Sequence, residues 1–201
     1  MLVPVFCSSY FPSIEYLQSC LQFAEIQLEC FENYPKQTLR NRCFILSPNG
    51  VQCLTVPVQH NGGNKILMKD VKINYEEEWQ RQHWRSLEAA YNRSAFFEFY
   101  RDELETLFFK QYDFLIDLNE NLFLWMMKKL KHNIIIKRTE MFTDESSFQF
   151  LSERKNNAIS SVSQKTKPYL QVFAYKFGFA ENLSGLDLLF NTGNASIEHL
   201  K

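Results

Sequence analysis

The chain has 201 residues, 45% of them hydrophobic, and its 22 basic and 23 acidic side chains give a formal net charge of −1. A chain of this length buries roughly 70% of the surface that its unfolded form exposes, so we expect a single domain over residues 1–201 that needs no disulfide or metal to fold. The balanced charge argues against a nucleic-acid partner, because duplex binders carry a basic excess that displaces counterions from phosphate.

The termini and cysteines predict a cytoplasmic protein. Residues 1–7 lack a basic leader and an apolar signal region, and the most apolar run, residues 122–127, is too short for the roughly 20 residues of a transmembrane helix. The five cysteines lie at irregular spacings without a CxxC pair, which favours reduced, buried thiols. Cys43 and Cys53 flank a predicted turn and could face each other, but we expect them to pack without forming a bridge.

The first thirty residues predict a β-α-β unit. Residues 2–7 form a short apolar run typical of a buried strand, and Ser13 is placed to cap a helix with apolar residues at helical spacing. Residues 25–30 alternate polar and apolar side chains, as a strand with one buried face does. A strand, a helix and a second strand in this order indicate parallel pairing.

A hairpin is predicted next. Residues 42–46 and 51–58 are rich in β-forming side chains, and Asn49-Gly50 between them supplies the positive φ angles of a tight turn. Residues 61–64 read as a loop, and residues 69–74 as a short additional strand.

The second half is expected to be helical and rich in aromatic rings, with 19 Phe in the chain as a whole. The predicted elements are a helix from Glu76, two or more helices in 96–130, a strand at 134–139, a surface loop at 143–167, a helix at 168–176 closed by Gly178, and a helix at 185–190 capped by Asn182 or Ser184. The fold class is therefore α/β, with a mixed sheet that begins with the β-α-β unit and the hairpin.

Motifs for known chemistry are absent from the sequence. There is no Walker loop, GxGxxG, GxSxG or HExxH, and the four histidines are too scattered for a metal set. We therefore predict no metal site, and the sequence indicates no particular cofactor.

The basic segment, which we define as residues 34–42, is the best candidate for a binding site. If its second half is extended, Arg40 and Arg42 project from one face and can grip a phosphate or carboxylate, with Lys36 adding a point charge. The alternative is structural: the arginines pair with Glu29 or Glu32 at a solvated strand edge.

Two other places could carry chemistry. Residues 8–12 follow the first strand and open a helix, which in open α/β sheets is where ligands bind, although an aromatic loop that plugs the sheet end fits as well. His83 lies in a dense group of rings, where a histidine is more often a packing residue than a base, yet burial can tune its pKa. Asp187 could be the buried partner of a basic residue.

Many of these residues also form motifs that resemble the WbqC-like protein family. The matching motifs, in order along the chain, are Tyr10-Phe-Pro12, Tyr34-x-Lys36-Gln-Thr-x-Arg-Asn-Arg-Cys43, the Asn49-Gly50 hairpin, Val56-Pro57-Val58, Trp79-x3-His83-Trp84, Asn182-Leu-Ser184 and Leu186-Asp187-Leu-Leu-Phe-Asn191 with Gly193. The resemblance spans nearly the whole chain, with a gap at 143–167.

The resemblance implies a role in surface-polysaccharide (O-antigen-type) biosynthesis, and a glycine-transfer role has been suggested for some relatives. On that basis we expect a transferase that moves an aminoacyl group such as glycyl to a sugar and binds a small anionic ligand, either a sugar nucleotide or an acyl donor. A non-catalytic binding or scaffold protein of the same pathway, with an aromatic patch at 96–100, is the alternative. The residues expected at the site are Tyr10, Lys36, Arg40, Asn41, Arg42 and Asn191 for binding, and His83 as general base.

Overall fold

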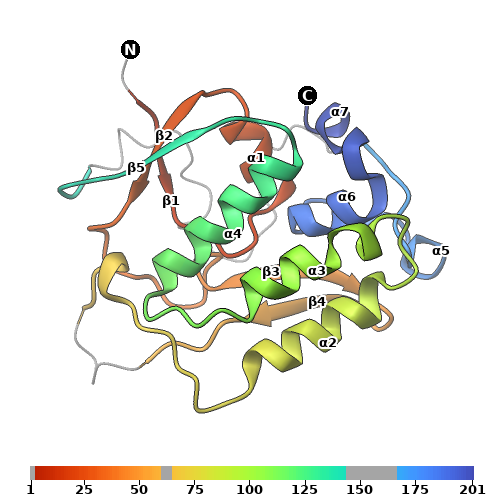
Figure 1. The fold of residues 1–201 in the computed structure, drawn as a ribbon, viewed down its shortest axis with the longest axis horizontal. Coiled ribbons are helices and arrows are strands. Elements are labelled where there is room, and N and C mark those ends of the chain that lie inside the picture. Colours follow the sequence, from red (N-terminus) through yellow and green to blue (C-terminus); the bar gives the residue numbers. More distant parts are fainter. Residues whose placement is uncertain (1–2, 60–64, 144–166) are drawn as a thin grey trace.

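A three-stranded parallel sheet forms one part of the molecule in a computed structural model that describes residues 3–59, 65–143 and 167–201 (Figure 1). Strands β1 (Val5–Cys7), β2 (Glu25–Glu29) and β5 (Ile135–Arg138) lie in the order β1-β2-β5. Helix α1 (Ile14–Cys20) connects β1 to β2. The Ser13 hydroxyl accepts a hydrogen bond from the Tyr16 N–H and so caps α1, as its position predicts. The predicted β-α-β unit with parallel strands is confirmed.

The predicted hairpin is also confirmed, but it forms a sheet of its own. Strands β3 (Arg42–Ser47) and β4 (Gly50–Thr55) pair only with each other, so the parallel and antiparallel strands of this α/β fold lie in two sheets. Gly50 alone supplies the positive φ of the turn, at +102°, and Asn49 does not share it. Cys43 lies opposite Leu54 and is buried, whereas Cys53 is exposed, so the two thiols do not face each other and all five cysteines are free.

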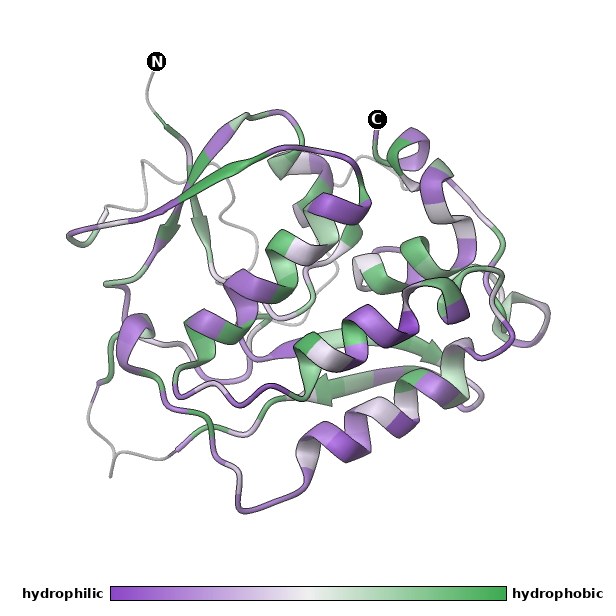
Figure 2. Ribbon diagram, in the orientation of Figure 1, coloured by the Kyte–Doolittle hydropathy of each residue, from purple (hydrophilic) through white to green (hydrophobic). Residues whose placement is uncertain are grey.

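Three longer helices follow the hairpin in the chain, and the first of them packs on it. Helix α2 (Trp79–Tyr91) packs against β3, and α3 (Phe97–Phe108) and α4 (Leu115–Lys129) pack against each other. Figure 2 shows that α2 and α3 are amphipathic, with hydrophilic and hydrophobic residues alternating along each helix. The prediction of two or more helices in 96–130 is confirmed by α3 and α4.

The short strand expected at residues 69–74 is not formed. The chain there makes a 3-10 helix, η1 (Met68–Asp70), because the Asp70 N–H bonds back to the Leu67 carbonyl instead of to a neighbouring strand. Only isolated bridges follow, at Lys72 and Ile73. Local hydrogen bonding therefore replaces a ladder at this position.

The C-terminal part differs from the prediction in one helix. Helix α5 (Ala174–Phe177) is shorter than the predicted 168–176, because the Gln171 side chain bonds both backbone groups of Ala180 and holds the preceding residues in a loop. Gly178, at φ +76°, ends this helix as predicted. Ser184 caps α6 (Gly185–Thr192), and the chain ends in η4 (Gly193–Ala195) and α7 (Ser196–Leu200). The loop expected at 143–167 lies almost entirely outside the described residues.

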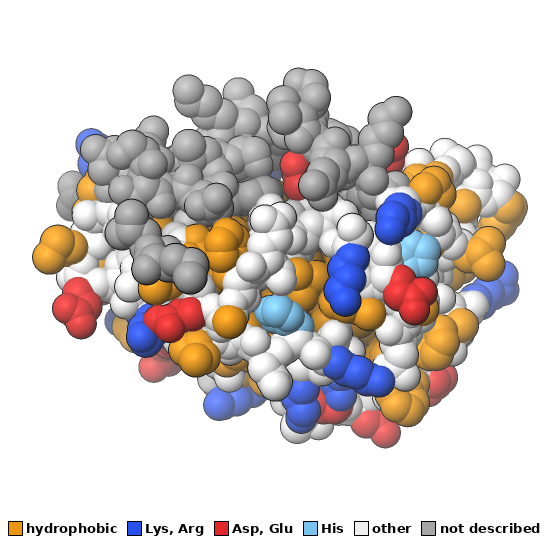
Figure 3. Space-filling model, turned by 90° about the horizontal axis from the view of Figure 1, so that it is seen from above, with side chains coloured by type: hydrophobic (Ala, Val, Ile, Leu, Met, Phe, Trp, Pro, Cys, Tyr) orange, Lys and Arg blue, Asp and Glu red, His pale blue; other side chains and the backbone are white. Residues whose placement is uncertain are grey.

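The surface carries both signs of charge. Figure 3 shows acidic and basic side chains interspersed on the face seen from above, with hydrophobic side chains between them. None of the helices in the described residues is long and apolar enough to cross a membrane.

Candidate functional site

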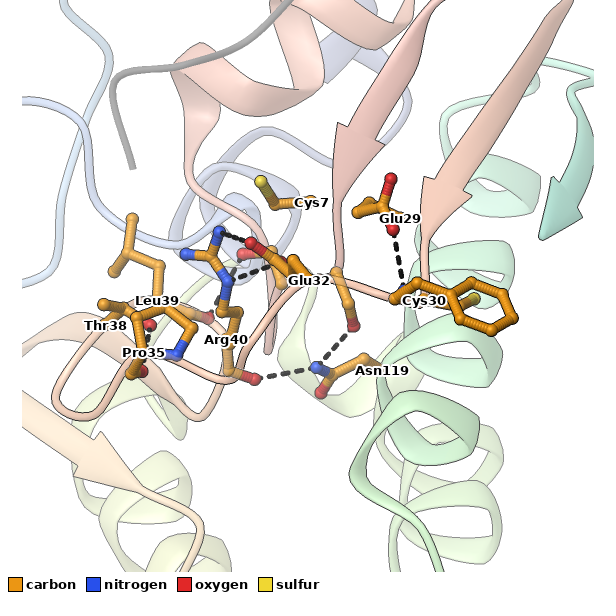
Figure 4. A network of polar contacts seen from close by, with 12 residues as sticks. Cys7, Glu29, Cys30, Glu32, Pro35, Thr38, Leu39, Arg40 and Asn119 are labelled. Carbon is orange, nitrogen blue, oxygen red and sulfur yellow. Dashed lines mark hydrogen bonds and ion pairs between the residues drawn. The ribbon is translucent and has the colours of Figure 1, made fainter. Parts of the chain in front are cut away.

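The carboxyl ends of the parallel strands bring together several of the most buried polar side chains in the described part of the chain (Figure 4). We call this group, comprising Ser8, Glu29, Glu32, Arg40 and Asn119, the strand-end cluster. Ser8 follows β1, and Glu29 ends β2. In open α/β sheets ligands bind where parallel strands end, so the cluster occupies the expected position of a site.

A buried ion pair lies within the strand-end cluster. Arg40 has no exposed surface, and its Nε and Nη2 atoms donate to the two carboxylate oxygens of Glu32 at 2.8 and 2.9 Å. The predicted extended geometry does not form at Arg40, because residues 36–41 make turns with Gln37 at φ +61°. The pairing of Arg40 with Glu32, expected as the structural alternative, is confirmed. Two forked charged hydrogen bonds fix the guanidinium plane.

Asn119 joins three segments that are distant in sequence. Its side-chain amide donates to the Ser8 hydroxyl at 2.9 Å and to the Arg40 carbonyl at 2.7 Å. Helix α4, the loop after β1 and the basic segment are therefore held together at one residue. Asn119 was not predicted from the sequence, although an amide between Leu118 and Leu122 on an apolar helix is itself an unusual pattern.

Glu29 connects the ends of β2 and β5. Its carboxylate accepts hydrogen bonds from the Phe31 N–H at 2.7 Å, the Thr139 hydroxyl at 3.3 Å and the Thr143 N–H at 3.0 Å. Neutral donors from three positions thus compensate a fully buried carboxylate. The sequence predicted Glu29 only as an ion-pair partner of an arginine. Its link between β2 and β5 could not be predicted, because the two strands are far apart in the chain and no local pattern connects them.

Three residues that adjoin Arg40 in sequence or through a hydrogen bond carry polar atoms without a partner in the described structure. Arg42 starts β3 with its guanidinium half-buried, and its Nε has no hydrogen-bond partner there. The side-chain oxygens of Asn41 and Asn119 are also buried without a partner, although Asn41 donates its amide to the Val56 carbonyl at 2.9 Å. One guanidinium donor and two amide acceptors are therefore buried without a partner in this region, which makes it the best candidate site in the described residues.

The guanidinium groups of the basic segment act on a nearby phenol. Burial raises the pKa of Tyr34 to about 12, and the positive charges of Arg42 and Arg40 oppose part of that rise. Both arginines are thus close enough to Tyr34 to act on its ionisation. Lys36, by contrast, is exposed in the preceding turn.

Tyr10 and His83 form a separate buried pair. The Tyr10 hydroxyl lies 2.9 Å from Nδ1 of His83, and both side chains are surrounded by the rings of Phe11, Trp79 and Phe108. Burial lowers the pKa of His83 to about 4, while a backbone hydrogen bond with Thr55 opposes part of the shift. The imidazole is thus neutral near pH 7 and already hydrogen-bonded, which describes a packing residue better than a general base.

His83 should make the fold sensitive to acid. Because its folded pKa of about 4 lies below the unfolded value of about 6.5, protonation favours the unfolded chain. The stability that the neutral imidazole contributes is complete above pH 6.5 and is lost as the pH falls toward 4, by about 3 kcal/mol. Urea unfolding of wild type and His83→Gln over this range measures the difference. An equal decline in both proteins would contradict the assignment.

Asn191 lies in another polar cluster. Its amide donates to the Asp187 carbonyl at 2.7 Å within α6, and it shares no hydrogen bond with the basic segment among the described residues. The Asp187 carboxylate accepts from the Tyr91 and Tyr169 hydroxyls and from Gln171, so its partners are neutral and not the basic residue considered above.

Metal ligands do not gather in the described ranges: no three His, Cys, Asp or Glu side chains there are arranged to hold an ion. The expected aromatic patch is also reduced to one side chain. Phe99 is 76% exposed, whereas Phe97 and Tyr100 are buried.

The family model of the WbqC-like protein family matches residues 8–153, well over half of the chain. The chain belongs to this family. The matched residues include the loop that follows β1, the whole basic segment and Asn119, so all of the strand-end cluster lies within the match. A protein of Mycobacterium tuberculosis, uncharacterized protein Rv1507c, is 26% identical over 221 residues, covering 96% of this chain and 91% of the relative. No solved structure matches the chain.

Proposed function

We propose that this chain is a transferase of cell-surface polysaccharide assembly that binds a small anionic substrate beside the strand-end cluster. Membership of the WbqC-like family supports the pathway. The observation that carries the binding proposal is the set of unpartnered buried atoms around Arg40, namely Arg42 Nε and the side-chain oxygens of Asn41 and Asn119. Buried polar atoms cost free energy when they lack a partner, so a ligand that supplies one gains affinity.

The chemistry of these atoms selects the ligand class. A guanidinium donates to a phosphate or carboxylate, and amide oxygens accept from a hydroxyl or an ammonium group. Sugar nucleotides and amino-acid derivatives carry both kinds of group. The ion pair between Arg40 and Glu32 fixes the structure beneath the site. Because Arg40 is already paired, Arg42 is the cation that binds the ligand.

The proposed reaction transfers an aminoacyl group such as glycyl to a sugar. The acceptor's amine or hydroxyl attacks the carbonyl carbon of an activated ester or thioester, and a new bond forms between them. The bond from that carbonyl to the donor's oxygen or sulfur breaks, and the leaving group takes the electron pair and the proton released by the nucleophile. The site would accelerate this reaction by holding the two substrates in the geometry of attack, so that a bimolecular step becomes effectively unimolecular.

Thermal unfolding with sugar nucleotides, nucleotides, acyl donors and amino acids tests the binding step. A ligand at 100 times its Kd stabilises the fold by about 2.7 kcal/mol, which raises the Tm of a chain this size by several degrees. We expect Arg42→Gln to abolish most of the shift, whereas Arg85→Gln, a change at an exposed arginine on α2, should retain it. An unchanged shift in Arg42→Gln would refute the site, and no shift with any compound would refute the substrate class.

A further inference from the structure

A groove between α3 and α4 has the features of a second binding site. It is open to solvent and has a volume of about 520 Å³. Leu107, Leu124 and Trp125 form its apolar part, and Lys110, Lys128 and Glu103 stand around it. None of these residues belongs to the strand-end cluster, so the groove is independent of the proposed transferase site.

One residue of the groove, Trp125, carries a buried indole N–H that lacks a partner in the described structure. Trp125 is only 5% exposed, and its Nε1 has no hydrogen-bond partner in the described structure. The ring itself is fixed, with an edge contact to Tyr100 at 6.2 Å and the Lys129 ammonium 5.9 Å from its centre. A buried donor without an acceptor is rare, and this one belongs to a residue that lines a cavity.

The charges around the groove favour an anion. Glu103 contacts both Lys128, at 3.6 Å, and Lys129, so one carboxylate serves two ammonium groups. Lys110 contacts the Tyr112 ring at 5.2 Å and has no carboxylate within ion-pair distance among the described residues. Positive charge is therefore in excess at the rim, although the chain as a whole is nearly neutral.

We infer that this groove binds an aliphatic chain that ends in a phosphate or carboxylate. The apolar part of the ligand would cover Leu107 and Leu124, the latter being 40% exposed. The anionic head would accept from Lys110 or Lys128, which act as point charges beside the Trp125 ring. A sugar lacks the charge that the lysines bind, and a free phosphate lacks the apolar chain that would cover the leucines.

NMR of the indole N–H groups tests the inference at the residue that carries it. The three tryptophans, Trp79, Trp84 and Trp125, give three signals in a ¹H–¹⁵N spectrum, and Trp125→Phe identifies one of them. Octyl phosphate and octanoate, kept below their micelle concentrations, are the probes. We expect both to move the Trp125 signal with saturation, while Trp79, whose Nε1 is also unpartnered but lies in the core, stays in place.

Two matched comparisons complete the experiment. Octyl glucoside and inorganic phosphate, which lack the head charge and the chain respectively, should leave the Trp125 signal unmoved. Leu124→Glu should weaken octyl phosphate binding about tenfold or more by placing a like charge in the groove, whereas Lys72→Gln, at an exposed lysine outside it, should have no effect.

Several results would overturn the inference. These are an unmoved Trp125 signal with both probes, equal movement of Trp79 and Trp125, and an equal response to octyl glucoside. Movement of the Trp125 signal on raising the protein concentration alone would also overturn it, because a second copy of the chain would then occupy the groove. A failure here leaves the strand-end proposal unaffected, since that proposal is tested by the ligand-induced Tm shift in Arg42→Gln.

Discussion

Replacing Arg40 with methionine is expected to lower the free energy of unfolding by about 3–5 kcal/mol. The substitution removes the guanidinium that donates to both oxygens of Glu32 and leaves a carboxylate that is only 2% exposed without this partner. A buried charge that loses its partner keeps its full cost of desolvation. This loss would be a large part of the stability of an ordinary domain.

The double variant Arg40→Met with Glu32→Leu separates the ion pair from simple packing. Replacing both partners with apolar side chains removes the uncompensated charge, so we expect the double variant to recover at least half of the loss. Urea unfolding at pH 7 measures all three proteins. If the single variant is as stable as wild type, or the double variant is no more stable than Arg40→Met, the buried pair does not hold the site together as described.

Replacing Asp187 with alanine is expected to cost about 3–5 kcal/mol. Its Oδ1 atom accepts from Tyr169 at 2.6 Å and Gln171 at 3.0 Å, and its Oδ2 atom accepts from Tyr91 at 2.9 Å. Alanine would leave the Tyr91 and Tyr169 hydroxyls without this acceptor and would open a small cavity, while the Gln171 amide keeps its hydrogen bond to the Ala180 carbonyl. The cluster joins α2, α6 and the segment before α5, so the loss should appear in global unfolding by urea.

Asp187→Asn is the matched control because it keeps the shape and one oxygen acceptor. Burial raises the pKa of the Asp187 carboxyl, and the hydrogen bonds from Tyr169, Tyr91 and Gln171 oppose part of the rise. With the folded pKa above the unfolded value of about 3.9, the carboxyl's contribution is complete at lower pH and falls as the pH rises above that value. The difference in stability between wild type and Asp187→Asn should therefore shift toward the variant as the pH rises. A difference independent of pH would contradict this.

Local patterns predicted most of the secondary structure. Ser13 and Ser184 mark helix starts because their hydroxyls cap the backbone, and both do so here. The alternation in 25–30 and the β-branched run at 134–139 predict strands, and these pair in parallel as β2 and β5. These signals are local in sequence, so they do not depend on the tertiary arrangement.

The site was harder to predict because its contacts are not local. Arg40 reads as a solvated cation in the sequence, yet the turn at 36–41 directs it inward to Glu32. Asn119 meets Ser8 across more than a hundred residues, and no spacing rule connects them. The segment 69–74 carries strand-forming side chains, but its first residues turn into a 3-10 helix and only isolated bridges, to Val58 and Phe114, form after it.

Hydrogen–deuterium exchange with the compound that most raises the Tm tests the central claim most directly, because it locates a ligand without assuming its position. We predict slowed exchange in peptides that cover residues 8–12 and 34–43, with the same peptides unprotected in Arg42→Gln. Protection confined to α3 and α4, or elsewhere away from the strand ends, would contradict the claim that the strand-end cluster carries the binding site of this WbqC-like protein.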